Sequence, residues 1–187
     1  GIVRAVRGSD GQELWSVPDH LLNAYCGIAV GDIDNDSNPE IIAVHESTVL
    51  IAFEHDGSLK WISSHVNNDV GRGAPSLADL DEDGSPEIVI GATVLNSDGT
   101  LRWHQRSGSG DIGRGPLSII ADLDLDGSPE IVAGRTAYRS NGDVYWNASV
   151  SDGFTAVGNF DTDLNPEIAL VTGGDLYLLE HSGNVKW

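Results

Sequence analysis

Short acidic segments carry most of the residues in this sequence that could do chemistry. The segment DLDEDGSPE begins at Asp79, and its carboxylates alternate along the chain before a Pro–Glu pair and an apolar, β-branched run. Related segments, GDIDNDSNPE, ADLDLDGSPE and GNFDTDLNPE, recur elsewhere in the chain. Carboxylates a few ångströms apart repel one another by roughly 1 kcal/mol or more per close pair in partly wet surroundings. A bound cation removes that penalty, so these segments predict cation sites.

The donor atoms of these loops favour a hard cation. Carboxylates at positions 1, 3 and 5 can point to one side of a tight turn, and glycine at position 6 allows the chain to reverse. Proline at position 8 keeps residue 7 extended with its carbonyl inward, and Glu at position 9 closes the shell. All these donors are oxygens, which favours calcium over magnesium or manganese and gives zinc little support. An EF-hand is excluded, because position 12 is Ile90 in the second loop and is not Glu in any loop.

A second motif recurs in phase with the acidic loops. It reads SDGQELW, HDGSLKW, SDGTLRW, SNGDVYW and HSGNVKW, and its tryptophans lie 41 to 46 residues apart. These tryptophans are Trp15, Trp61, Trp103, Trp146 and Trp187. A period of this length with strand-like segments is typical of a β-propeller. A residue repeated in every blade is expected to pack against the next blade rather than to stack on sugars.

Each unit contains four short strand candidates separated by Gly, Asp, Asn or Pro. In one unit they span residues 74–80, 86–92, 92–97 and 100–105. The sequence therefore predicts an all-β fold, a single β-propeller domain over residues 1–187 with four-stranded antiparallel blades. The predicted parts are a half-blade at 1–17 and blades at 18–62, 63–104, 105–147 and 148–187.

About four and a half blades are thus expected, as part of a larger propeller of seven or eight blades. The remaining blades are expected from a missing part of the chain or from a second copy. The absence of Met supports an excised piece of a longer protein. The alternative is a closed four-bladed ring in which residues 1–17 form an extra flap.

The acidic loops resemble those of the FG-GAP repeats, also called VCBS repeats, which occur in integrin α-chains and bind calcium on a β-propeller. The resemblance covers almost the whole chain and implies three to four Ca²⁺ sites. The implied ligands are Asp32, Asp34, Asp36, Asn38 and Glu40 in the first loop; Asp79, Asp81, Asp83, Ser85 and Glu87 in the second; Asp122, Asp124, Asp126, Ser128 and Glu130 in the third; and Asn159, Asp161, Asp163, Asn165 and Glu167 in the fourth.

Two loops depart from that pattern. Ser37 replaces the glycine of the first loop and Leu164 that of the fourth, where Asn159 also removes one charge. Because a positive φ is costly for Leu, the fourth loop is expected to adopt another geometry. The predicted order of calcium affinity is the second and third loops, then the first, then the fourth. The alternative for any loop is an Asp-rich turn that merely caps strands.

The amino-acid composition excludes some classes of binding partner. The chain carries 29 acidic and 10 basic residues, a formal net charge of −19, which argues against nucleic acid or an anionic membrane as partner. No apolar run is long enough for a transmembrane helix, so no direct membrane insertion is expected. The expected protein is a non-enzymatic, calcium-stabilised, extracellular or cell-surface propeller for adhesion or for binding a protein or carbohydrate ligand.

Two other functions stay open. Calcium-dependent rhamnogalacturonan lyases have similar metal loops, so the chain could be the propeller scaffold or a non-catalytic part of such a polysaccharide lyase. Its compact units carry no long insertion and no unmatched Lys, His and Arg cluster, which argues against catalysis. The third possibility is an architectural spacer that presents neighbouring domains.

Two near-identical pentads precede first strands. DVGRG spans 69–73 and DIGRG spans 111–115, and both contain an arginine. They form either a shared anion-binding face or Gly-rich turns in which each arginine pairs with a neighbouring Asp, and the second interpretation is the simpler. Specificity for a ligand is expected in the least repetitive loops, which are 17–27 with Tyr25 and 63–73 with His65.

Overall fold

The computed structural model describes residues 1–64 and 71–187, which form strands, turns and loops with no helix. The strands are β1 (Val3–Val6), β2 (Glu13–Val17), β3 (Ala29–Gly31), β4 (Glu40–Val44), β5 (Leu50–Phe53), β6 (Leu59–Ile62), β7 (Ser76–Ala78), β8 (Glu87–Ile90), β9 (Thr93–Leu95), β10 (Leu101–His104), β11 (Ile119–Ala121), β12 (Glu130–Ala133), β13 (Thr136–Tyr138), β14 (Val144–Asn147), β15 (Phe154–Gly158), β16 (Glu167–Thr172) and β17 (Asp175–Leu179). In the described ranges, no helix is long and apolar enough to cross a membrane.

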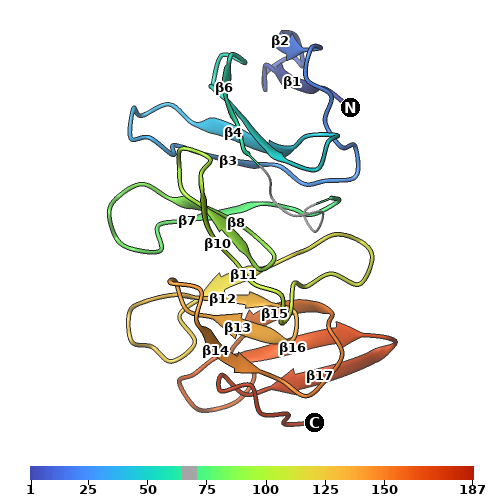
Figure 1. Ribbon diagram of the computed structural model, residues 1–187, viewed down its shortest axis with the longest axis vertical. Helices are drawn as coiled ribbons and strands as arrows, with labels where there is room; N and C mark the ends of the chain where they lie inside the picture. Colours follow the sequence, from blue (N-terminus) through green and yellow to red (C-terminus); the bar gives the residue numbers. More distant parts are fainter. Residues whose placement is uncertain (65–70) are drawn as a thin grey trace.

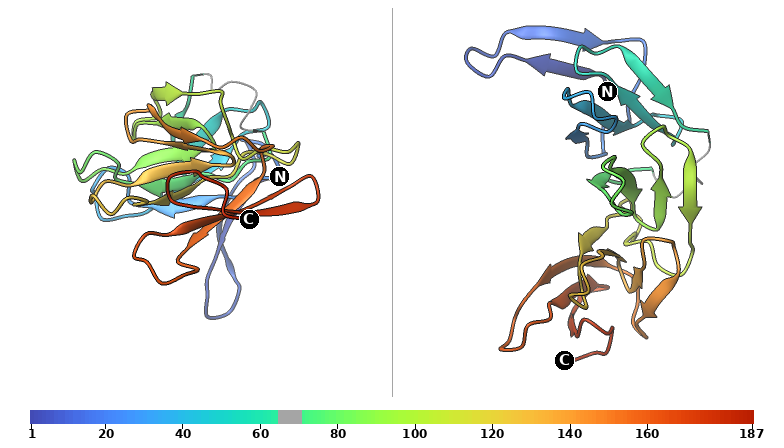
Figure 2. Two further views of the ribbon diagram at one scale, coloured as in Figure 1. Left: turned by 90° about the horizontal axis from the view of Figure 1, so that it is seen from below. Right: turned by 90° about the vertical axis from the view of Figure 1, so that its left-hand side faces the viewer.

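Consecutive strands pair antiparallel into separate sheets, as the repeat predicts. Strands β1 and β2 form a half-blade, and blades one to three are the four-stranded sheets β3–β6, β7–β10 and β11–β14. Blade four contains β15–β17, and its fourth strand is reduced to a bridge between Leu179 and Val185. The sheets follow one another along an arc, with the chain ends at opposite ends of the molecule (Figures 1 and 2). The ring is therefore open, as a partial propeller requires, and the closed four-bladed alternative is not formed.

The core lies between successive sheets. The second strand of each blade is a β-branched run, EIIAV, EIVI, EIVA or EIALVT, and such residues favour a pleated, buried surface. Every residue of β8 and β12 is buried. One cluster joins Ile42 of blade one to Ile88 of blade two, and equivalent clusters join the other neighbouring sheets. Each blade thus needs its neighbour to bury its apolar face.

Four of the repeated tryptophans pack against the neighbouring blade, which confirms the packing role predicted for them. Trp103 lies on the turn of blade three, where a Cβ added to Gly142 would meet the indole ring at 2.9 Å. The Trp103 Nε1–H donates to the Ser140 carbonyl at 2.9 Å. The same ring-on-glycine contact occurs for Trp15 with Gly57, Trp61 with Gly99, and Trp146 with Gly183. Trp187, in the same register, is 63% exposed.

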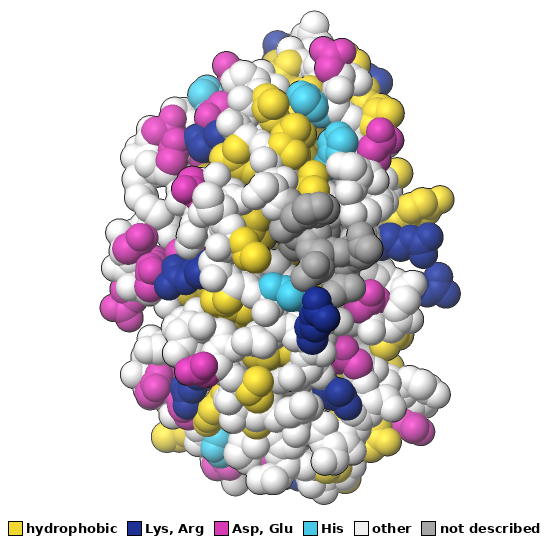
Figure 3. Space-filling view, viewed as in Figure 1, with side chains coloured by type: hydrophobic (Ala, Val, Ile, Leu, Met, Phe, Trp, Pro, Cys, Tyr) yellow, Lys and Arg dark blue, Asp and Glu magenta, His cyan; other side chains and the backbone are white. Residues whose placement is uncertain are grey.

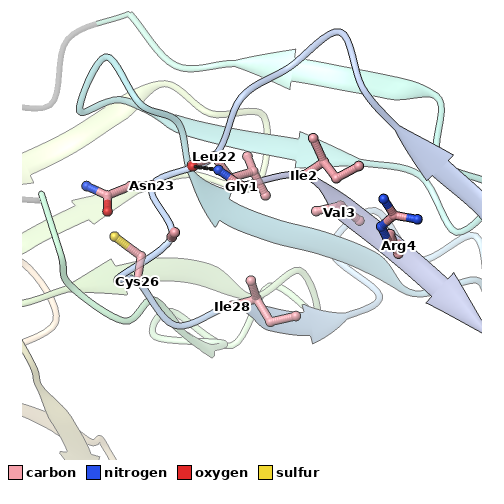
Figure 4. Close-up of a pocket in the computed structure, with 9 residues that line it drawn as sticks. Gly1, Ile2, Val3, Arg4, Leu22, Asn23, Cys26 and Ile28 are labelled. Atoms are coloured by element: carbon pink, nitrogen blue, oxygen red, sulfur yellow. Dashed lines mark hydrogen bonds between the residues drawn. The ribbon is translucent and has the colours of Figure 1, made fainter.

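A hollow of about 360 Å³ lies beside β1, between that strand and the segment leading into β3 (Figure 4). Its lining comes from Gly1 to Arg4 and from residues around Cys26, and the Gly1 amino group donates to the Leu22 carbonyl at 2.6 Å. Strand β1 pairs with β2 alone among the described strands, so its other edge faces this hollow. The number of blades and the domain boundaries remain predictions.

Candidate metal centres

The four acidic loops connect the first strand of each blade to the second, and they project from one side of the molecule (Figure 1). Their bounding pairs are β3 and β4, β7 and β8, β11 and β12, and β15 and β16. The proline at position 8 ends each loop, and the glutamate at position 9 begins the second strand. The first and second strands of each blade therefore hold its acidic loop at an equivalent position.

The position-9 glutamate ties each loop to its strand. In blade two, the Leu80 backbone N–H donates to Glu87 Oε2 at 2.9 Å. The equivalent bonds run from Ile33 to Glu40 at 2.9 Å, from Leu123 to Glu130 at 2.9 Å, and from Phe160 to Glu167 at 2.7 Å. All four glutamates are buried. A buried carboxylate needs such donors, and this bond fixes the carboxyl group next to the aspartates.

Carboxylate oxygens converge in all four loops. Three acidic side chains in each loop place an oxygen within 4.8 Å of one another. These groups are Asp32, Asp34 and Asp36; Asp79, Asp81 and Glu87; Asp122, Asp124 and Glu130; and Asp161, Asp163 and Glu167. Glu40 lies outside the first group, and Asp83 and Asp126 lie outside the second and third.

The other predicted ligands belong to the backbone framework of the loops. The N–H of residue 7 donates to the carboxylate at position 5 in each loop, at 2.7 to 2.9 Å; these residues are Asn38, Ser85, Ser128 and Asn165. Asn159 replaces an aspartate, and its Nδ2 donates to the Asp163 carbonyl at 2.7 Å. The carbonyl ligands predicted at position 7 remain predictions.

The fourth loop has a different backbone, as its Leu164 predicts. The first three loops turn through left-handed residues at positions 4 and 6, which are Asn35 and Ser37, Glu82 and Gly84, and Leu125 and Gly127, with φ between 59° and 96°. Neither Thr162 nor Leu164 of the fourth loop has a positive φ. In the first three loops the position-1 aspartate accepts the N–H groups of residues 5 and 6. The fourth loop, with Leu164 at position 6 and Asn159 in place of the position-1 aspartate, lacks this arrangement.

Each acidic cluster also holds one basic side chain, which the sequence interpretation missed. Lys60 Nζ lies 2.6 Å from Asp34 and 2.9 Å from Glu54. Arg102 Nη1 lies 2.8 Å from both Asp81 and Glu87. Lys186 pairs with Asp161, Glu167 and Glu180 in blade four. Figure 3 shows Lys and Arg side chains beside Asp and Glu on the side from which the loops project.

Blade three reaches the same arrangement from another position. The residue before the tryptophan is basic in the other blades, but it is Tyr145 here. Arg139 directly follows β13. It stacks on the Tyr145 ring at 3.9 Å and reaches Asp124 at 2.9 Å and Glu130 at 2.5 Å. In the half-blade, which has no acidic loop, the residue before Trp15 is Leu14. A basic residue before the tryptophan thus accompanies the acidic loop in blades one, two and four, and Arg139 takes its place in blade three.

The clusters fit calcium on two further observations. Glu40 Oε1 and Asp124 Oδ1 are buried oxygens with no hydrogen-bond partner. Lys60 Nζ lies 3.8 Å from Glu40 Oε1, beyond hydrogen-bond distance, and a buried acceptor without a hydrogen bond is costly, so an additional cation at these oxygens would stabilise the fold. The donor set is oxygen throughout, with no thiolate or imidazole in the groups. Such sets suit calcium or magnesium rather than zinc.

Burial and the basic side chains act in opposite directions on these carboxyls. Burial raises the pKa of Glu40, Glu87 and Glu130 above the ordinary value for glutamate. The hydrogen bond from Lys60 lowers the pKa of Asp34, and that from Lys186 lowers the pKa of Asp161. The aspartates are therefore held ionised beside their basic partner, as a metal ligand must be.

Replacing a basic partner should enlarge the response to calcium. In Lys60→Gln, the buried Glu40 carboxylate and Asp34 lose their countercharge, so the metal-free protein should lose about 1–3 kcal/mol of unfolding free energy. Bound calcium supplies positive charge at the same oxygens, so the loss should shrink when calcium is saturating. Thermal unfolding with chelator and with calcium should therefore show a larger calcium-induced rise in Tm for the variant. Arg7→Gln, in the half-blade, is the control, and an equal rise in Lys60→Gln and wild type would contradict the prediction.

Comparisons with known proteins agree with this architecture. Residues 32–90, which contain the first two acidic loops, match the family model described as FG-GAP-like repeat. No curated protein sequence matches the chain. Among solved structures, the V. cholerae biofilm matrix protein Bap1 is 29% identical, with a TM-score of 0.84 over 100% of this chain and 32% of Bap1.

Two rhamnogalacturonan lyases share the fold at lower identity. The Bacillus licheniformis lyase PL11 is 19% identical with a TM-score of 0.74, and the lyase YesW is 20% identical with a TM-score of 0.72. The chain spans about a third of the length of each of these proteins. Residues 32–90 thus match the FG-GAP-like repeat, and the chain folds as an open, partial β-propeller.

Proposed function

We propose that the chain is a calcium-stabilised, non-enzymatic part of an extracellular binding module, with adhesion as its role. The observation that carries the proposal is the convergence of three carboxylates at the same place in all four blades. Full-length structural likeness to part of a biofilm matrix protein supports an extracellular setting. Extracellular modules hold calcium at about 10⁻⁴ to 10⁻³ M, so such a fold is secure where calcium is abundant.

Calcium should raise the thermal stability of the chain strongly. A site that binds only the folded form adds about 1.4 kcal/mol when the calcium concentration is about ten times its Kd. Three sites would together add about 4 kcal/mol, which corresponds to a rise in Tm of about 10 °C for a chain of this size. The measurement is thermal unfolding in 1 mM calcium against excess chelator.

Magnesium at the same concentration is the matched control. It demands a smaller, near-octahedral shell and gives up its water reluctantly, so it should raise Tm much less than calcium. Equal Tm values in calcium and chelator would contradict the proposal. Equal rises with both ions would contradict the choice of calcium.

The scaffold of a polysaccharide lyase is the second candidate, and the fold shared with two lyases favours it. A lyase needs a base and cationic groups that face the substrate. Four basic side chains, Lys60, Lys186, Arg102 and Arg139, are engaged by the acidic loops. Arg72 and Arg114 form no ion pair in the part of the chain that the structure describes, so they are the groups that a substrate carboxylate could meet. Incubation with rhamnogalacturonan should release no unsaturated sugar product, and its release would show that the chain is itself catalytic rather than a scaffold or a binding module.

A further inference from the structure

A basic pocket lies on loops that the metal sites do not use. Its volume is about 410 Å³, and its described lining consists of Tyr25, Arg72 and Arg114. A pocket of this size is within the range of small-molecule sites. Each of the three residues precedes the first strand of its own blade, β3, β7 or β11. The pocket therefore draws one side chain from each of three consecutive blades.

Backbone contacts between these loops hold the pocket together. The Gly27 N–H donates to the Gly73 carbonyl at 3.1 Å, and the Ala74 N–H donates to the Pro116 carbonyl at 3.3 Å. The approach is so close that a Cβ on Gly115 would lie 2.1 Å from the Arg72 backbone. Glycine at 115 is thus required for the two arginine loops to touch. The spacing of the pocket residues is set by the backbone of the propeller.

The arginines are available to a ligand. Within residues 1–64 and 71–187, neither Arg72 nor Arg114 forms an ion pair, although the chain is strongly acidic. The Asp111 carboxylate accepts the backbone N–H groups of residues 113 to 115 and not the Arg114 guanidinium. Pairing of each arginine with a neighbouring Asp, the simpler interpretation of the pentads, is therefore wrong for Arg114. Asp69 and His65 lie outside the described residues.

Tyr25 adds an aromatic face to the two positive charges. It is 79% exposed, and the Arg72 guanidinium lies 5.6 Å from its ring centroid. An exposed tyrosine ring offers an apolar face against which the C–H groups of a ligand ring can pack. The tyrosine hydroxyl can also take part in hydrogen bonds. Guanidinium groups bind carboxylates through paired N–H donors. The combination fits a ring that carries a carboxylate.

We propose that Tyr25, Arg72 and Arg114 bind an acidic saccharide, with a uronate carboxylate on the arginines and its sugar ring on the tyrosine. The proposal gives the binding module a ligand class, and to that extent rests on the proposed function. The pocket lies at the start of the first strands, whereas the acidic loops follow their ends. In Figure 3, Lys and Arg side chains stand out at the edge opposite the acidic loops. An anionic ligand thus approaches on the side away from the four acidic loops, and the Asp111 carboxylate next to Arg114 is bonded to backbone N–H groups.

The test is a titration of the calcium-loaded chain with a galacturonic acid trisaccharide, followed by calorimetry or NMR shifts. Loss of one arginine–carboxylate pair typically costs about tenfold in affinity. Arg72→Gln and Arg114→Gln should each weaken binding about tenfold, and Tyr25→Ala should weaken it several-fold. Arg7→Gln removes an exposed arginine that pairs with Asp10, and should leave the affinity unchanged. Thermal unfolding in calcium should be the same for all variants.

Four results would overturn the proposal. They are no binding of the trisaccharide, equal binding by the arginine variants, equal binding of the neutral glucose trisaccharide maltotriose, and equally tight binding of inorganic phosphate or of a hexaglutamate peptide. Equally tight binding of phosphate would assign the pocket to anions in general, and equally tight binding of hexaglutamate would assign it to acidic protein segments. A calcium-induced rise in Tm that persists alongside any of these results would leave the calcium-stabilised module intact. Failure is therefore attributable to the pocket or to the metal sites separately.

Discussion

Trp103→Ala should unfold the chain at a Tm about 10 °C below that of the wild type. The indole fills the space over Gly142 of the next blade and donates to the Ser140 carbonyl. Truncating a packed tryptophan typically costs about 3–5 kcal/mol, because the lost contacts leave a cavity that the backbone cannot close. For a chain of this length each kcal/mol corresponds to about 2–4 °C in Tm. The measurement is calorimetric or spectroscopic melting in calcium.

The sequence itself supplies the matched control. Trp187 occupies the same register as Trp103 but is 63% exposed. Trp187→Ala removes the same side chain without opening a contact between described blades, so it should cost about 1 kcal/mol or less. If both variants lost the same stability, the tryptophans would not act through packing between blades.

Glu130→Ala should cost about 3–5 kcal/mol of unfolding free energy and abolish one calcium site. The buried carboxylate accepts the Leu123 N–H at 2.9 Å and faces Arg139 at 2.5 Å. Removing this buried carboxylate leaves the Leu123 N–H without its acceptor and takes the closest carboxylate from Arg139, which keeps its pair with Asp124. The expected readouts are the free energy of unfolding in denaturant and the number of calcium ions bound.

Two variants control this experiment. Glu46→Ala removes one negative charge from an exposed position outside the acidic loops, and its effect should stay within about 0.5 kcal/mol. Glu130→Gln keeps an oxygen that can accept the Leu123 N–H, so it should recover part of the stability lost in Glu130→Ala. A Glu130→Ala protein as stable as Glu46→Ala, with its full complement of calcium, would refute the role assigned to this residue.

The fold could be predicted from the period of the sequence repeat and from the residues that form its turns. Strand candidates at 74–80, 86–92, 92–97 and 100–105 contain β7, β8, β9 and β10, because Gly-containing turns and Pro–Glu pairs punctuate the strands. The final strand was harder. Residues after Leu179 have the right pattern but only a bridge to Val185, and no local signal distinguishes an ordered strand from a bridge.

Only those parts of the candidate metal centres that lie close together in the sequence could be predicted from it. Alternating aspartates in the sequence predict the acidic loop that contains them. Leu164 predicts the different backbone of the fourth loop. The basic partners are not local: Lys60 lies 26 residues from Asp34 and reaches it only because the fourth strand folds back beside the loop. In blade three the basic residue moves to Arg139 with Tyr145 in the usual position. Only the spatial contact reveals that exchange.

Calcium bound per chain at equilibrium tests the central claim most directly. Equilibrium dialysis of the full chain against 1 mM free calcium, followed by elemental analysis, avoids losing weakly held ions during desalting. We predict three to four calcium ions per chain in the wild type and one fewer in Glu130→Ala. No calcium above the dialysis background, or a count unchanged in Glu130→Ala, would contradict the assignment of the carboxylate clusters as metal centres.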